Sequence, residues 1–245
     1  MKHAPYIRHV DGGKKVILFI HGFLGSPRHF DMFLPLVPKD VAVYNLLLPG
    51  HGENVLAFGR SSMQEWKMHV HAIMQELAAQ YQEIISVGHS MGTFFAMDAA
   101  KKFPSCVTQL FLLASPLQIG LKPFAVKNSL KSLFQCMDEQ DEIAKAYADA
   151  HSVTLNFRFW EYLTWIPRYI ELFQESKRHR KQIGTLTLPC SFYQSGKDEL
   201  VSPKSARFIP KTEHMQLKIL KHSTHFIYAT EDKMVFLTEF QNLFQ

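Results

Sequence analysis

The chain has 245 residues, 47% of them hydrophobic and 20% charged, which is enough apolar sequence to bury one large core in a single domain. Its formal net charge of +5 is modest and no basic repeat is present, so no nucleic-acid-binding module is predicted. No apolar run approaches the ~20 residues that a membrane-spanning helix needs.

Cysteine usage and the N-terminal residues bear on the cellular compartment. The three cysteines, Cys106, Cys136 and Cys190, are odd in number and show no regular spacing. They fit neither a disulfide framework nor a zinc site, and they suit a reducing cytosol. Residues 1–5 lack the apolar core of a signal peptide. We therefore expect a cytoplasmic protein without a bound metal.

Strands and helices alternate along most of the chain. Short apolar runs predict strands at residues 16–20, 41–47, 84–88, 109–114, 189–194 and 215–220, with room for one more at residues 6–10. Apolar periodicity predicts helices at residues 62–81, 91–102, 202–208 and 230–244. The first of these helices is well marked, because Ser62 and Glu65 form a capping-box pattern. This alternation predicts a mostly parallel sheet with helices on both faces.

Residues 117–184 break the alternation and contain no convincing strand. Segments 127–137, 139–150 and 167–180 are predicted to be helical, and Pro167 suits the first turn of the last one. The region is rich in aromatic side chains: Phe157, Phe159, Trp160, Tyr162, Trp165, Tyr169 and Phe173. We expect most of them to pack this region onto the rest of the protein, and a few to line a substrate cleft.

The sequence Gly88-His89-Ser90-Met91-Gly92 lies between a predicted strand and a predicted helix. A G-x-S-x-G sequence in this context is typical of a nucleophile elbow. The two glycines relieve crowding in the tight turn and tolerate a strained backbone. The Ser90 hydroxyl would then stand at the end of the sheet, and the Met91 N–H would point to developing negative charge.

A serine hydroxyl needs a general base, and the base needs an orienting acid. In this architecture they follow along the chain as Ser, then Asp or Glu, then His. Asp198 comes just after the strand at residues 189–194, and His225 just after the strand at residues 215–220. The carboxyl ends of parallel strands meet at one edge of a sheet, so these two side chains can reach Ser90 there.

Each of these two assignments has a rival close by. Glu199 is the alternative acid, one position further along the turn than Asp198. His222 is the alternative base, but it lies nearer to the strand, and it is His225 that an aromatic residue follows directly. Three other histidines are expected to fix loop shapes or to point away from the serine hydroxyl: His21, His51 and His89.

Five motifs, spread over nearly the whole chain, together resemble the α/β-hydrolase family. They are His-Gly-Phe-Leu-Gly at residues 21–25, Pro-Gly-His-Gly at 49–52, the elbow at 88–92, the acid loop at 195–201 and the histidine loop at 223–226. The resemblance implies Ser90 as nucleophile, His225 as base and Asp198 as acid. It also implies that the Phe23 and Met91 amides form an oxyanion hole. One departure is Thr224, where the family more often has glycine before the histidine.

The same resemblance implies an α/β-hydrolase fold with a helical cap. The cap would be residues 117–184, inserted after the strand at about 109–114, on a core of residues 1–116 and 185–245. Leu24, Trp160 and Trp165 are the candidate substrate-binding residues.

The implied activity is hydrolysis of a carboxylic ester with an apolar acyl group through an acyl-enzyme, without a cofactor. The partner would be a small-molecule ester, and within the family the closest likeness is to carboxylesterases and monoacylglycerol-lipase-like enzymes. Three alternatives stay open: a lyase of the menaquinone-pathway type, a cofactor-free perhydrolase and a non-catalytic binding protein. The lyase would use its anion-binding arginines, and candidates stand in the cap region: Arg158, Arg168, Arg178 and Arg180.

Overall fold

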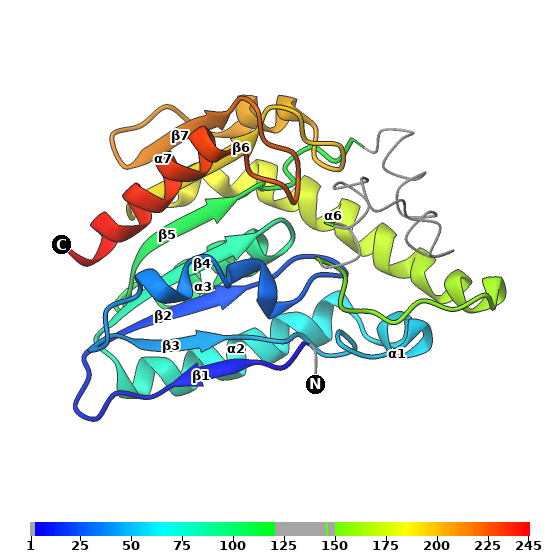
Figure 1. Ribbon diagram of the computed structural model, residues 1–245, viewed down its shortest axis with the longest axis horizontal. Coiled ribbons are helices and arrows are strands. Elements are labelled where there is room, and N and C mark those ends of the chain that lie inside the picture. Colours follow the sequence, from blue (N-terminus) through cyan, green and yellow to red (C-terminus); the bar gives the residue numbers. More distant parts are fainter. Residues whose placement is uncertain (1–2, 121–145, 147–149) are drawn as a thin grey trace.

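The computed structural model describes residues 3–120, 146 and 150–245 of the chain (Figure 1). Its middle layer is a seven-stranded sheet with the strand order β1-β3-β2-β4-β5-β6-β7. The edge strand β1 runs antiparallel to β3, and all other neighbouring strands in this sheet are parallel. The strands are β1 (Tyr6–Arg8), β2 (Lys15–Ile20), β3 (Ala42–Asn45), β4 (Glu83–His89), β5 (Val107–Leu113), β6 (Cys190–Ser195) and β7 (Met215–Leu220).

Helices cover both faces of this sheet. One face carries α2 (Met63–Gln80) and α3 (Gly92–Lys102), and α6 (Ile166–Gln182) packs against both of these helices. The other face carries α7 (Thr230–Gln241) and two short 3-10 helices, Pro27–Phe30 and Leu34–Leu36. The layers of Figure 1 are therefore helix, sheet and helix, as the sequence predicts.

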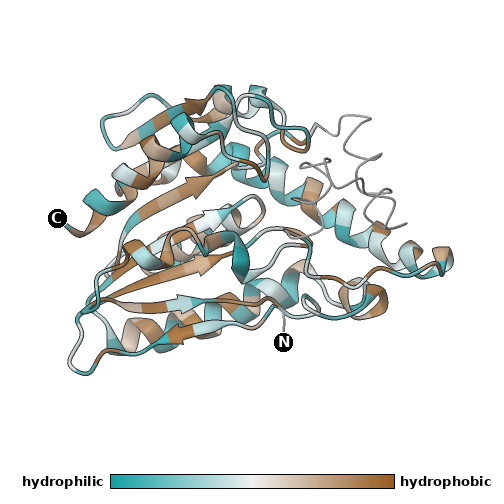
Figure 2. Ribbon diagram, viewed as in Figure 1, coloured by the Kyte–Doolittle hydropathy of each residue, from teal (hydrophilic) through white to brown (hydrophobic). Residues whose placement is uncertain are grey.

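The central strand β2 shows why the sheet is covered on both sides. Val16, Leu18 and Ile20 belong to the core under α2 and α3, whereas Ile17 and Phe19 belong to the core under α7. All five side chains are buried, because successive residues of a strand point to opposite faces. Figure 2 shows the resulting hydrophobic colour along the central strands.

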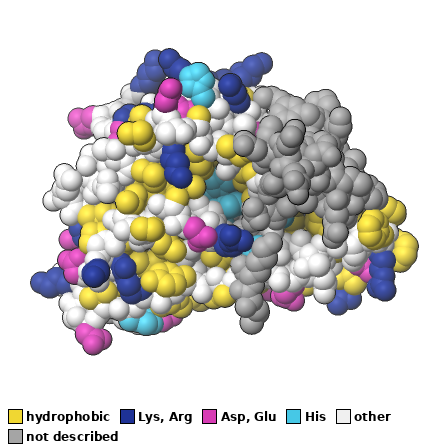
Figure 3. Space-filling view, viewed as in Figure 1, with side chains coloured by type: hydrophobic (Ala, Val, Ile, Leu, Met, Phe, Trp, Pro, Cys, Tyr) yellow, Lys and Arg dark blue, Asp and Glu magenta, His cyan; other side chains and the backbone are white. Residues whose placement is uncertain are grey.

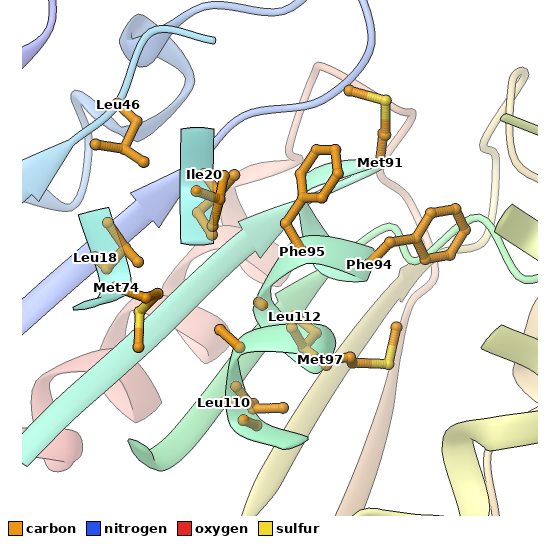
Figure 4. Packing of buried hydrophobic residues seen from close by; sticks show 14 of the residues in the cluster. Leu18, Ile20, Leu46, Met74, Met91, Phe94, Phe95, Met97, Leu110 and Leu112 are labelled. Carbon is orange, nitrogen blue, oxygen red and sulfur yellow. The ribbon is translucent and has the colours of Figure 1, made fainter. Parts of the chain in front are cut away.

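Helix α3 brings the elbow and the core together. Its first turns contribute Phe94, Phe95 and Met97, which are all buried, and Figure 4 shows them beside Leu110 and Leu112 of β5. Because this helix begins directly after Ser90, packing of its apolar face fixes the position of the candidate nucleophile.

Most predicted elements are confirmed, and the differences are at short segments. The predicted helix at residues 202–208 is a 3-10 helix, Pro203–Phe208, a geometry that is common in short helical segments. The predicted helix at 230–244 is α up to Gln241 and 3-10 beyond it. In the insertion, the helix expected at 167–180 is α6, whereas the helices expected at 127–137 and 139–150 fall, except for Ala146 and Ala150, outside the described residues.

Helix α1 (Val55–Arg60) is short, contains a glycine and was not predicted from the sequence. The Asn54 side chain caps it by accepting a hydrogen bond from the Ala57 N–H at 3.0 Å. Gly59 lets the 3-10 helix Phe159–Trp165 approach closely, since a Cβ there would collide with Thr164. A tertiary contact about one hundred residues away in sequence therefore explains this helix. Within the described residues, no helix is both long and apolar enough to cross a membrane.

Replacing Phe33 by alanine tests the aromatic core under α7. Its ring lies 4.7 Å from that of Phe240, 5.7 Å from that of Phe236 and 6.3 Å from that of Phe19. Phe33→Ala should lower the free energy of unfolding by about 3–5 kcal/mol in a denaturant titration. Met234→Ala, at a position of α7 that is 66% exposed, should change it by less than about 0.5 kcal/mol. Equal losses in both variants would contradict this account of the core.

Candidate active site

The turn between β4 and α3 holds Ser90 in a strained backbone conformation. Its φ angle is 53°, in the left-handed region that favours glycine. The Ser90 N–H donates to the Leu113 carbonyl at 2.9 Å, and the Thr93 hydroxyl donates to the Ser90 carbonyl at 2.7 Å. Both flanking glycines are required: a Cβ on Gly92 would collide with the Ile20 carbonyl, and one on Gly88 would lie 2.7 Å from Thr93 Cα. Packing thus holds the serine at the carboxyl edge of the sheet.

The loop after β2 approaches this serine closely. A Cβ built on Gly22 would lie 2.8 Å from Ser90 Cβ and 3.4 Å from its Oγ, so only glycine allows the approach. The residues that follow Gly22 and Ser90 along the chain are Phe23 and Met91, and Met91 is the N-cap residue of α3. The first amides of a helix have no partner within it, so amides of this kind can donate to a negatively charged atom.

Histidine side chains fix the two loops at this edge. His21 donates from Nδ1 to the Gly22 carbonyl at 2.9 Å, and its Nε2 accepts the Leu48 N–H at 3.1 Å. His51 donates from Nδ1 to the Pro49 carbonyl at 3.2 Å. Burial lowers the pKa of His51 to about 4, and burial together with His51 lowers the pKa of His21 well below its usual value. Both imidazoles are therefore neutral near pH 7, and their hydrogen bonds hold the two loops in place.

Asp198 and His225 meet at the same edge. His225 Nδ1 donates to Asp198 Oδ2 at 2.8 Å, and both side chains are almost fully buried. The other carboxylate oxygen of Asp198 accepts the Leu200 and Val201 amides at 2.9 and 2.8 Å. This pattern fixes the carboxylate and leaves Nε2 as the ring nitrogen of His225 that is free of Asp198.

The two rival residues have other contacts. Glu199 is also buried, but its Oε2 accepts the backbone N–H of His225 at 3.2 Å. His222 is exposed, and its N–H donates to Asp232 at 2.8 Å. Of the four residues weighed from the sequence, the structure joins the side chains of Asp198 and His225.

The pKa of His225 is shifted in the opposite direction from those of its neighbours His89 and His151. Burial disfavours its charged form, but the charge and hydrogen bond of Asp198, helped by the charge of Glu199, outweigh burial and raise its pKa. Burial and the proximity of His225 lower the pKa of His89 to about 3 and that of His151 to about 4. Of these three neighbouring histidines, His225 is the one whose pKa is raised, which favours its protonated form.

The elbow also touches this histidine directly. His89 donates from Nε2 to the His225 carbonyl at 3.2 Å, and the centres of the two rings lie 4.9 Å apart. Because His89 precedes Ser90 directly, its contacts with His225 hold the His225 loop against the elbow.

A cavity of about 180 Å³ adjoins His225. Its walls include His29, His89, Phe226 and Tyr228, and Arg28 and Asp31 lie at the same cavity. Three buried polar atoms at this cavity, the two ring nitrogens of His29 and the Tyr228 hydroxyl oxygen, have no hydrogen-bond partner within the described residues. Figure 3 shows histidine side chains at the bottom of a hollow on this face. The sequence analysis missed His29 and Tyr228; their closeness to motif residues His21 and His225 along the chain was the available signal.

The candidate substrate-binding residues lie at different places. The Leu24 carbonyl accepts the Ser152 N–H at 2.9 Å, which ties the oxyanion loop to the insertion. Trp165 is buried and donates its indole N–H to the Val55 carbonyl at 2.8 Å, so it fastens the insertion to α1. Trp160 is 67% exposed on the 3-10 helix Phe159–Trp165. The ring centre of Tyr169 of α6 lies 4.9 Å from that of Phe23, the residue after Gly22.

The arginines of the insertion have partners of their own. Arg158 pairs with Glu161 at 3.3 Å, and the Arg180 guanidinium lies 5.2 Å from the centre of the Phe208 ring. Arg168 donates to the Gly59 and Ser61 carbonyls, and Arg178 pairs with Asp98 and Glu175. Three of the four guanidinium groups, those of Arg168, Arg178 and Arg180, attach the insertion to the body of the protein, whereas the Arg158 pair lies within the insertion.

One group in the described part of the chain has the residue types of a metal site. Ligand atoms of Asp98, Glu175 and His179 lie within 4.8 Å of one another. The charges of Arg178 and Lys67 balance the two carboxylates, so the group has the character of an ion-pair network between α2, α3 and α6.

Fold and site together define a hydrolase of the α/β class. The model of the alpha/beta hydrolase family matches residues 17–235, and the chain belongs to this family. Among solved structures, it is similar to a metagenome-derived lipolytic enzyme, with a TM-score of 0.73 and 20% identity over 98% of this chain and 96% of the other. It is also similar to the monoacylglycerol lipase of Paleococcus ferrophilus, with a TM-score of 0.69 and 17% identity over 99% and 98%. At these identities the likeness shows the fold.

The chain matches only part of the length of two curated relatives. The chain is 27% identical over 232 residues to the dihydrolipoyllysine-residue acetyltransferase component of the acetoin cleaving system of Pseudomonas putida, covering 86% of this chain and 59% of that protein. It is 30% identical over 112 residues to an uncharacterized hydrolase of Bacillus subtilis, covering 45% and 40%. The chain thus spans at most about three fifths of the length of these relatives.

Proposed function

We propose that this protein is a serine hydrolase that cleaves a carboxylic ester through an acyl-enzyme. The observation that carries the proposal is the buried hydrogen bond of 2.8 Å between His225 Nδ1 and Asp198 Oδ2, in a loop packed against the Ser90 elbow. A neutral imidazole held in this tautomer can take a proton at Nε2, as a general base must. Lipolytic enzymes among the solved structures of the same fold add support.

In the proposed mechanism, Ser90 Oγ attacks the ester carbonyl carbon while His225 Nε2 takes the hydroxyl proton. The carbonyl oxygen becomes an oxyanion, which the Phe23 and Met91 amides stabilise; a donor of this kind is typically worth ~10²–10³ in turnover. The tetrahedral intermediate expels the alcohol, which takes the proton from His225. Water then attacks the acyl-enzyme by the same steps and releases the carboxylic acid and Ser90.

The surroundings of Ser90 suggest which end of the ester lies where. We assign the acyl chain to the side of Phe23 and Tyr169, whose rings pack together and offer an apolar wall. We assign the alcohol to the cavity beside His225, where His29 and Tyr228 present unpaired polar atoms. This favours an apolar acyl group and an alcohol that carries further hydroxyl groups. We also propose that residues 150–184, the longest described stretch of the insertion, form part of the cap over this cleft.

Two of the three alternatives from the sequence, the lyase and the non-catalytic binding protein, receive less support. A lyase with an anionic substrate would need free cationic groups, but the arginines of the insertion are engaged with carboxylates, carbonyls and an aromatic ring. A non-catalytic binding protein has no need for the buried pair of Asp198 and His225, because burying ionisable groups is costly.

Ser90→Ala should lower the rate of ester hydrolysis about 10⁴-fold or more, because it removes the hydroxyl oxygen that attacks the ester. The fold should stay intact, since only one atom is lost. Hydrolysis of a short nitrophenyl ester and covalent labelling by a fluorophosphonate should both be lost, and circular dichroism should be unchanged. Turnover within tenfold of the wild type would rule out Ser90 as the nucleophile.

The pH dependence follows from the raised pKa of His225. Catalysis needs its neutral form, so kcat/KM should rise with pH and reach a plateau, with a midpoint above the usual value of about 6.5. His225→Ala should be about 10⁴-fold less active, whereas His222→Ala, at an exposed position, should keep most of its activity. The opposite result in these two variants would make His222 the base.

Acyl-chain preference tests the apolar wall. From acetate to octanoate esters, kcat/KM should rise by a few-fold per methylene, as burial of about 0.8 kcal/mol each implies, and then pass a maximum where the pocket ends. Tyr169→Ala should reduce the preference for the best ester over acetate. Trp160→Ala, at an exposed position, should reduce it less. A flat series in the wild type would contradict an apolar acyl pocket.

A further inference from the structure

Glu199 is a second carboxylate beside the His225 loop, and the proposed mechanism gives it no role. Its side chain is 0% exposed, as deeply buried as that of Asp198. Burying a carboxylate costs desolvation free energy unless its charge is balanced or hydrogen-bonded. A neutral residue at this position would avoid that cost if the loop had a structural role alone. Its location therefore calls for a physical account.

Two consecutive residues hold the same histidine at two points. Asp198 Oδ2 accepts the ring Nδ1–H of His225 at 2.8 Å, and Glu199 Oε2 accepts its backbone N–H at 3.2 Å. The first contact fixes the ring, and the second fixes the main chain from which the ring projects. Because both carboxylates are out of water, both negative charges act on the imidazole with little screening.

We propose that Glu199 is a positioning residue of this active site. Its carboxylate anchors the backbone of the loop that carries His225 and places a second negative charge beside the imidazolium that forms during turnover. The proposal rests on the proposed function, because it acts through His225 as the base.

The other groups that face His225 leave this role to the two carboxylates. Burial lowers the pKa of His89 to about 3 and that of His151 to about 4, and it lowers the pKa of His29 well below its usual value. These rings are neutral where His225 titrates. Burial raises the pKa of the Tyr228 hydroxyl, which also stays neutral, and the Arg28 and Asp31 side chains at the same cavity pair with each other at 3.6 Å.

The pH profile of fluorophosphonate labelling separates charge from anchoring. Labelling joins Ser90 Oγ to phosphorus, expels fluoride and needs His225 to take the serine proton, so its rate reports the neutral imidazole without knowledge of the natural ester. Glu199→Gln keeps an oxygen for the His225 N–H but removes the charge. Its plateau rate should stay within about threefold of the wild type, and its midpoint should fall by about one pH unit.

Glu199→Asp makes the converse change, since it keeps the charge and shortens the reach. Its midpoint should match the wild type, whereas its plateau should fall several-fold because the backbone contact is lost. This variant tests the anchoring role even if Glu199→Gln does not fold, and a plateau unchanged from the wild type would overturn that role.

Asp232→Asn is the matched control. Asp232 accepts the His222 N–H at 2.8 Å and the Ser223 hydroxyl at 2.7 Å, so it is another carboxylate that holds this loop. Its side chain does not contact His225 among the described hydrogen bonds, and its removal should leave the midpoint unchanged.

The outcomes distinguish this inference from the proposed function. Two results would show that Glu199 has no special electrostatic role, provided that the wild type is labelled at Ser90. One is a pH midpoint of Glu199→Gln equal to that of the wild type, and the other is a midpoint shift in Asp232→Asn as large as that in Glu199→Gln. If the wild type is not labelled, or Ser90→Ala is labelled as fast, the proposed function itself fails.

Discussion

The site depends on the left-handed backbone of Ser90. A φ of 53° is costly for a serine and persists only because β4, β5 and α3 hold the turn from all sides. That packing leaves no room for a Cβ at positions 22, 88 and 92. The glycine at position 22 lets the loop after β2 come against Ser90, the proposed nucleophile. The other two glycines allow the close approaches to Thr93 and to the Ile20 carbonyl on which the turn depends.

The imidazoles at this edge of the sheet differ in the direction of their pKa shifts. The buried rings of His21, His51 and His89 are neutral near pH 7, because burial lowers the pKa of each. They contribute hydrogen bonds without adding charge. Asp198 and Glu199 direct their negative charge at His225, which keeps the ability to be protonated despite its burial. A general base needs this difference between similar side chains.

The insertion shows how residues that suggest substrate binding can serve attachment instead. Trp165 and Arg168 both bond carbonyls of α1 and the residues beside it, and Arg178 joins α6 to α3 through Asp98. His179 stacks on Phe94, in the first turns of the elbow helix, with ring centres 4.3 Å apart. The position of α6, and with it the Phe23–Tyr169 wall, therefore depends on contacts with α3, the helix that follows Ser90.

By itself the sequence determined the alternation of strands and helices, the elbow at Ser90 and the candidates Asp198 and His225, because each of these is written in a short stretch of chain. Short apolar runs and a glycine pair around a serine are patterns of a few consecutive residues. Only the tertiary structure decided that Asp198 and not Glu199 bonds the imidazole, that Trp165 faces α1, and that α1 exists at all. These outcomes depend on contacts such as that of Trp165 with Val55, between residues 110 positions apart, whose approach no local pattern encodes.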